Sequence, residues 1–371
     1  MTKKKLAGII GGCIVVVIVI VAMSIPTPRV KYTLNVSVDP PQAGSVSPSS
    51  GDYDSGLQIT LAASPLSGYT FDYWDGAASG SSNTVTITMN SNKTVTAHFK
   101  VVDHEPPPAQ GTLTVHFIDV GQGDSILLDL GDTEVLIDGG EKSPGVVSYI
   151  DDYVDGPLEV VVATHPHTDH IGGLIAVSNA FEVNEIWLNG DTSTSQTYSQ
   201  FMSAVNSESA NVHVARRGDI IEVGNLTFNV LNPVNLSGTI NNNSIVLSLS
   251  YGQVDFLFAG DAEQEAEASM LAQGIVPDVE ILKVGHHGSR TASSTQFLQA
   301  AKSECAIYMA GQGNSYGHPH EETITNLCEI DAEIYGTDIH GTIVITTDGV
   351  TYNVLPSNNV PSVVCPTSSN S

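Results

Sequence analysis

Apolar residues follow three different patterns along this chain. An uncharged apolar run spans Leu6–Ile25, alternating apolar and polar positions fill 32–100, and short apolar runs alternate with helix-like stretches in 111–355. Proline marks 101–110, and Ser, Asn and Pro are frequent in 356–371. The pattern therefore predicts an N-terminal membrane anchor or signal segment (1–26), a small all-β module (32–100), a stiff linker (101–110), one α/β domain (111–355) and a disordered tail (356–371).

The N-terminal apolar run is long enough to cross a bilayer. Leu6–Ile25 contains about 20 residues, which is the length that a transmembrane helix needs. Lys3, Lys4 and Lys5 precede it, and a basic flank predicts a cytoplasmic N-terminus with the rest of the chain outside. The length of the run favours a single-pass anchor in the cell membrane. A cleaved signal peptide, which would give a secreted protein, stays open because Ala22-Met23-Ser24 fits a cleavage site.

The segment 32–100 predicts short β-strands. Leu34–Val38, Val85–Met89 and Val95–Phe99 alternate, and Gly, Pro and Ser clusters separate them. Tyr69–Trp74 supplies most of the aromatic side chains, and we expect Trp74 in a small core rather than on a binding surface. The segment resembles the divergent internalin-type B-repeat of bacterial surface proteins. This resemblance implies a stalk or an adhesive spacer and leaves its cell-surface partner unidentified.

A cluster of potential metal ligands follows one buried strand of the α/β domain. The β-branched run Leu158–Ala163 is typical of such a strand, and the next seven residues contain His165, His167, Asp169 and His170. Imidazole nitrogens and carboxylate oxygens are ordinary zinc ligands. We expect His165 and His167 to share one ion, and Asp169 and His170 to reach a second.

Two later strands also end in ligand residues. The apolar strand that begins at Val254 ends before Asp261, whose carboxylate is expected to bridge two ions. A second apolar run ends before His286 and His287. One of these histidines should bind the second ion, while the other faces the substrate or holds a ligand in place.

Further polar residues are candidates for contact with the substrate. Lys283 precedes the histidine pair and either extends to solvent or reaches an anionic substrate. His318 lies in a Gly- and Pro-containing loop and is a candidate for substrate contact or proton transfer. Gln122 and Asp124 lie in a glycine-rich turn after a strand, and we expect them beside the ligands at most.

Six segments in order narrow the interpretation: 115–125, 164–173, 242–247, 260–261, 283–289 and 316–320. Together they resemble the hydrolase domain of the ComEC competence proteins, a branch of the metallo-β-lactamase superfamily, over about Leu113–Leu355. The resemblance implies a four-layer αβ/βα sandwich with two divalent metal ions, Zn or Mn, in a cleft at one edge of the sheets. It implies phosphodiester hydrolysis, including degradation of DNA strands.

The resemblance also bears on individual residues. It favours His287 as the ligand of the histidine pair, because the last histidine of the superfamily usually precedes a glycine. Many members have a further histidine where this chain has Asn243 and Ser244, so these two are expected beside a first metal that is weakly held or is manganese. Asp169 is expected to orient the nucleophile, and His286, His318 or Lys283 to stabilise phosphate oxygens or protonate the leaving group.

Charge and cysteine content limit the possible partners. The formal charge is −27, and the residues beyond Lys100 carry −29, from six cationic and 35 acidic side chains. Such a surface repels long polyanions, which argues against tight binding of nucleic acid through a basic track. The four cysteines (Cys13, Cys305, Cys328 and Cys365) form no paired motif, so no disulfide framework is expected.

These observations favour an extracellular metal-dependent phosphodiesterase or nuclease. Its expected substrates are phosphodiesters, including DNA or short oligonucleotides, and its nucleophile is a hydroxide activated by a two-metal site. Two alternatives remain. The same fold supports hydrolysis of a carboxyl ester, lactone or β-lactam, and a non-catalytic surface-binding protein would depend on the β module instead.

Overall fold

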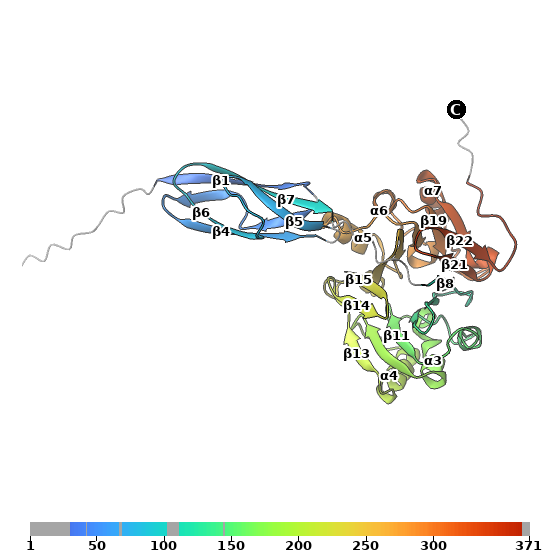
Figure 1. Ribbon diagram of the computed structural model, residues 1–371. Helices are drawn as coiled ribbons and strands as arrows, with labels where there is room; N and C mark the ends of the chain where they lie inside the picture. Colours follow the sequence, from blue (N-terminus) through green and yellow to red (C-terminus); the bar gives the residue numbers. More distant parts are fainter. Residues whose placement is uncertain (1–29, 42, 67–68, 102–110, 144, 366–371) are drawn as a thin grey trace, which may run out of the picture. The chain divides into compact units, whose positions relative to one another are not determined.

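A computed structural model describes residues 30–41, 43–66, 69–101, 111–143 and 145–365 (Figure 1). The chain divides into two compact units, one ending at Val101 and the other beginning at Val102. The expected anchor (1–26) and nearly all of the expected linker lie outside the described residues. Within the described ranges, no helix is both long enough and apolar enough to cross a membrane.

The first unit is built from two antiparallel-rich sheets of short strands. One sheet has the order β3-β1-β7-β5 and the other the order β2-β4-β6. Trp74 is 2% exposed and donates its indole N–H to the carbonyl of Ser82, so its predicted place in the core is confirmed. The strands are β1 (Lys31–Asp39), β2 (Gly44–Ser47), β3 (Gly51–Asp54), β4 (Gln58–Pro65), β5 (Tyr69–Gly76), β6 (Thr84–Thr88) and β7 (Lys93–Val101).

The second unit contains two larger sheets. The eight-stranded sheet has the order β13-β12-β11-β10-β9-β8-β21-β22, and the seven-stranded sheet runs from β14 to β20 in chain order. The first comprises β8 (Leu113–Phe117), β9 (Ile126–Asp129), β10 (Glu134–Ile137), β11 (Leu158–Ala163), β12 (Val183–Leu188), β13 (Asn211–Val214), β21 (Ile343–Thr347) and β22 (Tyr352–Pro356). The second comprises β14 (Ile220–Val223), β15 (Leu226–Asn232), β16 (Val246–Tyr251), β17 (Val254–Phe258), β18 (Ile281–Lys283), β19 (Cys305–Tyr308) and β20 (Glu333–Gly336).

Strand β11 shows why the second unit has four layers. Val160 and Val162 enter the core shared by the two sheets, whereas Val161 and Ala163 pack with residues of the outer helices. Side chains alternate between the faces of a strand, so a strand that is apolar throughout needs cover on both sides. Apolar residues on the outer face of the seven-stranded sheet likewise pack against residues of outer helices. The predicted helix-sheet-sheet-helix sandwich is confirmed.

Helices form the outer layers (Figure 1). Residues of α1, α3 and α4 pack on the eight-stranded sheet, and residues of α5, α6 and α7 pack on the seven-stranded sheet. Ser195 and Ser294 cap α4 and α6 by accepting backbone N–H groups. The helices are α1 (Val147–Ile150), α2 (Thr168–Ile171), α3 (Leu174–Ala180), α4 (Gln196–Ser207), α5 (Gln264–Ala272), α6 (Thr295–Ala301), α7 (Glu321–Glu329) and α8 (Thr337–His340), with 3-10 turns η1 (Asn241–Asn243) and η2 (Gly285–Gly288).

The C-terminal segment is ordered as far as Cys365, which corrects two expectations. Cys365 forms a disulfide with Cys328, and the N–H of Val363 donates to the carbonyl of Ile334 at 2.8 Å. The predicted disordered tail is therefore wrong for 357–365, and the absence of a disulfide was wrong as well. The two cysteines are separated by 37 positions and meet only through the tertiary fold, so no spacing motif reveals them.

The buried carboxyl of Glu134 gives a pH-dependent prediction. Burial, and then Glu159, Asp155 and other nearby acids, raises the pKa of Glu134 from 4.5 to about 7. A carboxyl group with a raised pKa binds its proton more tightly in the folded state, so it lowers stability as pH rises through 4.5 to 7. We expect Glu134→Gln to raise Tm at pH 8 and to leave it nearly unchanged at pH 4.5, as measured by thermal unfolding.

The exposed strand residue Glu222 provides the matched control for this experiment. Glu222→Gln should shift Tm by less than Glu134→Gln at pH 8. A stabilisation by Glu134→Gln that is equal at both pH values would contradict the predicted titration.

Candidate metal centre

Loops from different strands converge on one pocket of the second unit. Residues 164–171 follow β11, Asp261 follows β17, and η2 follows β18. The pocket has a volume of about 350 Å³, which lies within the range of small-molecule sites. Its lining residues are Gln122, His167, Thr168, Asp169, Asn241, Asp261, His286, His287, Tyr316 and His318.

Asp261 lies at the centre of the polar cluster. Its Oδ2 is 3.3 Å from Nε2 of His170, 3.6 Å from Nε2 of His165 and 3.8 Å from Nε2 of His286. Its Oδ1 is 3.4 Å from Nε2 of His287. The carboxylate thus lies between His165 on one side of the cluster and His170 and His287 on the other, which is the placement expected of a ligand shared by two ions.

Two groups of potential ligand atoms share this carboxylate. One group consists of His165, His167 and Asp261, and the other of Asp124, His170, Asp261 and His287; the ligand atoms within each group lie within 4.8 Å of one another. In the first group, Nε2 of His165 is 2.9 Å from Nδ1 of His167. Two imidazole nitrogens at this separation can bind the same cation.

Hydrogen bonds determine which ring nitrogen faces the site. Nδ1 of His170 lies 2.8 Å from Oδ2 of Asp138, and Nδ1 of His287 lies 2.9 Å from the carbonyl oxygen of Met309. A carbonyl oxygen only accepts, and so does an ionised carboxylate, so each Nδ1 carries a proton and each Nε2 faces the site, where it can bind a metal ion once its own proton has left. Asp138 and Met309 were not anticipated from the sequence.

The ligand set fits a divalent metal. Nε2 of His170, Nε2 of His287 and Oδ1 of Asp261 are buried and have no hydrogen-bond partner among the described residues. Buried polar atoms without a partner are rare because they cost free energy. A cation between them would satisfy all three atoms at once.

The electrostatics of the cluster also favour a bound dication. Burial lowers the pKa of His170 and His287, but Asp261 and a second carboxylate outweigh it and raise both pKa values well above the usual range. Burial acts to raise the pKa of Asp261, but His287 and His170 hold it well below its usual value. Protons on the imidazoles thus compensate the buried carboxylates, and a dication can replace them. Burial keeps the pKa of His165 and His167 low, which leaves both rings neutral.

Three of the expected substrate-contacting residues border the pocket. Asp169 places Oδ2 at 3.3 Å from Nε2 of His287 and keeps its side chain 22% exposed. His286 turns Nδ1 toward Thr291 (3.0 Å) and is also 22% exposed. Burial, followed by His287 and His286, lowers the pKa of His318 to about 4, so its imidazole is neutral at neutral pH.

The structure separates the two residues expected at the third-histidine position. Ser244 accepts the N–H of Asp261 (3.2 Å) and lies 3.3 Å from Nδ1 of His165, so it supports both ligands. Asn243 instead donates to Asp191 (2.7 Å), which corrects its expected position beside the metals. Asn241, which the sequence did not single out, lines the pocket with its amide nitrogen 3.3 Å from Nε2 of His286.

Lys283 does not face the pocket, which corrects its expected role as a substrate contact. The residue is 1% exposed, forms an ion pair with Asp124 and donates to the carbonyl of Gly260 at 3.1 Å. The other oxygen of Asp124 lies 3.2 Å from Nδ1 of His287. Burial of an ammonium group requires a compensating charge, so Lys283 and Asp124 form a buried pair that supports His287.

Close backbone packing explains two glycines of the motifs. Gly123 has φ +127°, and a Cβ there would lie 2.1 Å from the carbonyl oxygen of Asp169. A Cβ on Gly173 would lie 2.0 Å from the carbonyl oxygen of Gly139. Larger side chains at either position would push apart the loops that carry Asp169 and His170. Gln122, in the same turn as Gly123, lines the pocket and accepts the N–H of Gly311 at 3.2 Å.

Comparison with protein families identifies both units. Residues 118–312 match the metallo-beta-lactamase superfamily. The chain belongs to this superfamily. Residues 34–103 match the divergent InlB B-repeat domain, so the predicted resemblance of the β module is confirmed.

Competence proteins are among the relatives of the superfamily domain. The chain is 28% identical to ComE operon protein 3 of Bacillus subtilis over 256 residues, covering 62% of this chain and 32% of that protein. It is 27% identical to competence protein ComA of Neisseria gonorrhoeae over 242 residues, covering 64% of this chain and 32% of that protein. The chain therefore spans about a third of the length of these relatives. The expected relationship to competence proteins is confirmed.

Solved structures include similar metallo-β-lactamase folds. YhfI of Bacillus subtilis gives a TM-score of 0.47 at 13% identity, covering 64% of this chain and 100% of that chain. A diphosphatase of the PhnP family gives a TM-score of 0.38 at 17% identity, covering 61% of this chain and 94% of that chain.

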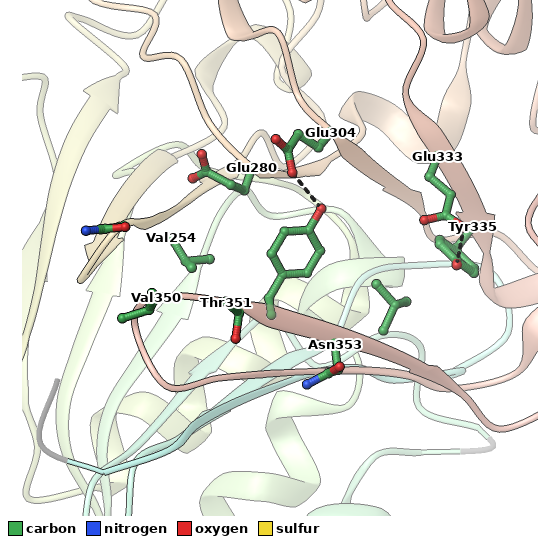
Figure 2. A pocket seen from close by; sticks show the side chains of 11 residues that line it. Val254, Glu280, Glu304, Glu333, Tyr335, Val350, Thr351 and Asn353 are labelled. Atoms are coloured by element: carbon green, nitrogen blue, oxygen red, sulfur yellow. Dashed lines mark hydrogen bonds between the residues drawn. The ribbon is translucent and has the colours of Figure 1, made fainter.

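A larger cavity of about 650 Å³ lies at the other ends of the strands and carries different chemistry. Glu280 and Glu304 directly precede β18 and β19, and Glu333 begins β20. Tyrosine hydroxyls donate to two of these carboxylates, at 3.1 Å to Glu304 and 2.8 Å to Glu333 (Figure 2). Its lining residues include no histidine, so the candidate metal centre of this superfamily member is the smaller histidine-rich pocket.

The ligand arrangement predicts different metal contents for two variants. Asp261→Ala removes the carboxylate shared by both ligand groups, so we expect the loss of most bound metal and of activity. Asn243→Ala removes the bond to Asp191 and should retain the metal content of the wild type, with a loss of about 1 kcal/mol in stability. Elemental analysis of the purified full-length variants, with thermal unfolding as a folding control, measures both effects. Equal metal losses would contradict this assignment.

Proposed function

We propose that this chain is an extracellular metal-dependent phosphodiesterase for small phosphodiesters, single-stranded ends and short oligonucleotides. The observation that carries the proposal is the pair of ligand groups joined by Asp261 at an open pocket. Membership of a superfamily of metal-dependent hydrolases and the similarity to competence proteins support it. We propose two divalent ions, Zn or Mn, as the cofactors.

The proposed ligands divide between the two ions. His165 and His167 would hold one ion and His170 and His287 would hold the other, and Asp261 belongs to both groups of potential ligands. When bound, such ions lower the pKa of a water molecule and neutralise charge on a phosphate. Asp138 and the carbonyl of Met309 keep the rings of the second pair oriented, which preserves the geometry during turnover.

Residues at the pocket surface act on the substrate in this proposal. Asp169 is ionised, because the contact with His287, 3.3 Å away, and the charge of His170 outweigh burial and lower its pKa. It accepts a hydrogen bond from the attacking water and orients it toward phosphorus. His286 and the neutral His318 donate N–H groups to the phosphate oxygens, and the buried amide nitrogen of Gln122, which has no partner among the described residues, adds another donor.

The charge distribution supports a short substrate. None of the ten lining residues is Lys or Arg, and the chain beyond Lys100 carries −29. Duplex-binding proteins neutralise many phosphates with basic side chains. Attraction here acts on the one or two phosphates that reach the metal centre.

The substrate prediction is tested with the metal-loaded full-length chain. We expect hydrolysis of a nitrophenyl ester of thymidine 5′-monophosphate and of short single strands, with weak affinity for long duplex DNA. The dependence of kcat/KM on salt should be shallow and correspond to roughly one or two phosphate contacts. Asp261→Ala is the inactive control.

Three outcomes would contradict parts of this proposal. Tight duplex binding with a steep salt dependence would favour a general nuclease that acts on long DNA. Turnover of a carboxyl ester, lactone or β-lactam without phosphodiester cleavage would favour the alternative hydrolase. Retention of metal without any turnover would favour a surface-binding role for the chain.

We also propose that both units lie outside the cell, anchored by Leu6–Ile25, with the B-repeat module as a spacer toward an unidentified surface partner. The basic flank of the apolar run supports this orientation. The Cys328–Cys365 disulfide supports it independently, because disulfides persist mainly in oxidising compartments.

The orientation predicts accessibility on intact cells. Protease added outside should release the hydrolase unit, and thiol labelling should find Cys328 and Cys365 oxidised before lysis. Protein found in the medium would support the cleaved, secreted form. Protection until the membrane is lysed, with a cytoplasmic marker protein protected in parallel, would overturn the proposal.

A further inference from the structure

We propose that Tyr316 stacks on a nucleobase of the substrate, so that the pocket selects phosphodiesters that carry a base next to the scissile phosphate. This inference rests on the proposed phosphodiesterase function and narrows its substrate class. It concerns a residue whose side chain has no role in holding the metal ligands.

Tyr316 is an exposed aromatic residue at the active pocket. Its side chain lines the pocket together with His318 and the metal-site residues, yet the residue is 64% exposed. Exposure of a large apolar side chain to water is unfavourable in free energy. An exposed ring beside a catalytic centre is therefore available to cover an apolar part of the substrate.

The loop holds Tyr316 in a fixed position. The side-chain oxygen of Asn314 accepts the N–H groups of Tyr316 (3.1 Å) and His318 (3.0 Å). Its amide nitrogen donates to the carbonyl of Gly311 at 2.9 Å. These bonds tie the turn to one side chain, so the backbone that carries the ring is positioned before the substrate arrives and loses little freedom on binding.

The two rings of this loop suit different parts of a nucleotide. The rings of Tyr316 and His318 are nearly parallel, with centroids 5.7 Å apart and an interplanar angle of 20°. The ring of His318 also lies 5.5 Å from the ring of His286, on the side of the metal centre. A phosphate bound near His286 and His318 leaves the outer face of Tyr316 for the adjoining base.

The rest of the pocket offers no alternative site for a base. Apart from Tyr316, the lining residues are histidines, carboxylates, amides and one threonine. The proposed function already uses these histidines for the metal ions and the phosphate, so Tyr316 is the lining aromatic ring that remains for a base. Stacking on an aromatic side chain tolerates any base and does not require cationic residues, which is consistent with an acidic surface.

The test compares two substrates that differ only in a base. Thymidylyl-thymidine and an analogue in which one thymine is absent are hydrolysed by the full-length protein loaded with Mn²⁺. We expect the wild type to prefer the intact dinucleotide in kcat/KM. Tyr316→Ala should reduce this preference about tenfold, and Tyr316→Phe should retain it because the ring remains.

Tyr73→Ala is the matched control, because Tyr73 is also an exposed tyrosine stacked on a histidine (His98, 4.4 Å) but belongs to the B-repeat module. It should leave the substrate preference unchanged. An unchanged preference in Tyr316→Ala, or equal losses on both substrates, would overturn the stacking role.

A binding measurement separates this inference from the proposed function. If the wild type cleaves no phosphodiester, the proposed function fails, and calorimetry with thymidine 5′-monophosphate and deoxyribose 5-phosphate still tests the stacking. Tighter binding of the nucleotide that disappears in Tyr316→Ala supports the role of Tyr316. Equal affinities of the wild type for the two ligands overturn it.

Discussion

The buried negative charge of Asp261 is the constraint on which the site depends. Its carboxylate is 2% exposed and lies within 4 Å of nitrogens from four histidines. Burial of a carboxylate is costly unless charge and hydrogen bonds compensate it. The loops after β11 and β18 supply this compensation as imidazoles. Metal binding and the correct docking of these loops are therefore thermodynamically coupled, because a cation satisfies atoms that the protein alone leaves unpaired.

The same constraint accounts for the unusual backbone of the site. Asp138, His286 and His287 have φ values of 57°, 47° and 55°, in the left-handed region that residues other than glycine seldom adopt. Each such residue costs on the order of 1–3 kcal/mol. In return, the adjacent side chains of η2 diverge: His287 turns Nε2 toward Asp261, while His286 turns toward Thr291 and the pocket. Local strain thus places two histidines in two different roles.

The sequence predicts the strand ends and the ligand types, but not the contacts that orient them. Apolar runs followed at once by His or Asp identify the loops because strand ends meet at one edge of the sandwich. The same rule would have found Asp138, which directly follows the apolar strand β10. The ion pair of Lys283 with Asp124, the bond of Asn243 to Asp191 and the Cys328–Cys365 disulfide depend on partners distant in sequence. No local pattern records such partners, so only the tertiary structure reveals them.

The acidic surface and the proposed binding of a phosphate at the metal centre are compatible because the two act over different distances. At physiological ionic strength, charges on the surface are screened beyond about 8 Å, so much of the −29 beyond Lys100 is not felt by a single phosphate at the metal centre. A long duplex, in contrast, places many phosphates along that surface at once. Repulsion then grows with the length of the substrate, while the attraction of the metal centre does not. In the proposed function, the surface would therefore discriminate against long polyanions without weakening the chemistry at one phosphodiester, and its negative potential would attract divalent cations toward the site.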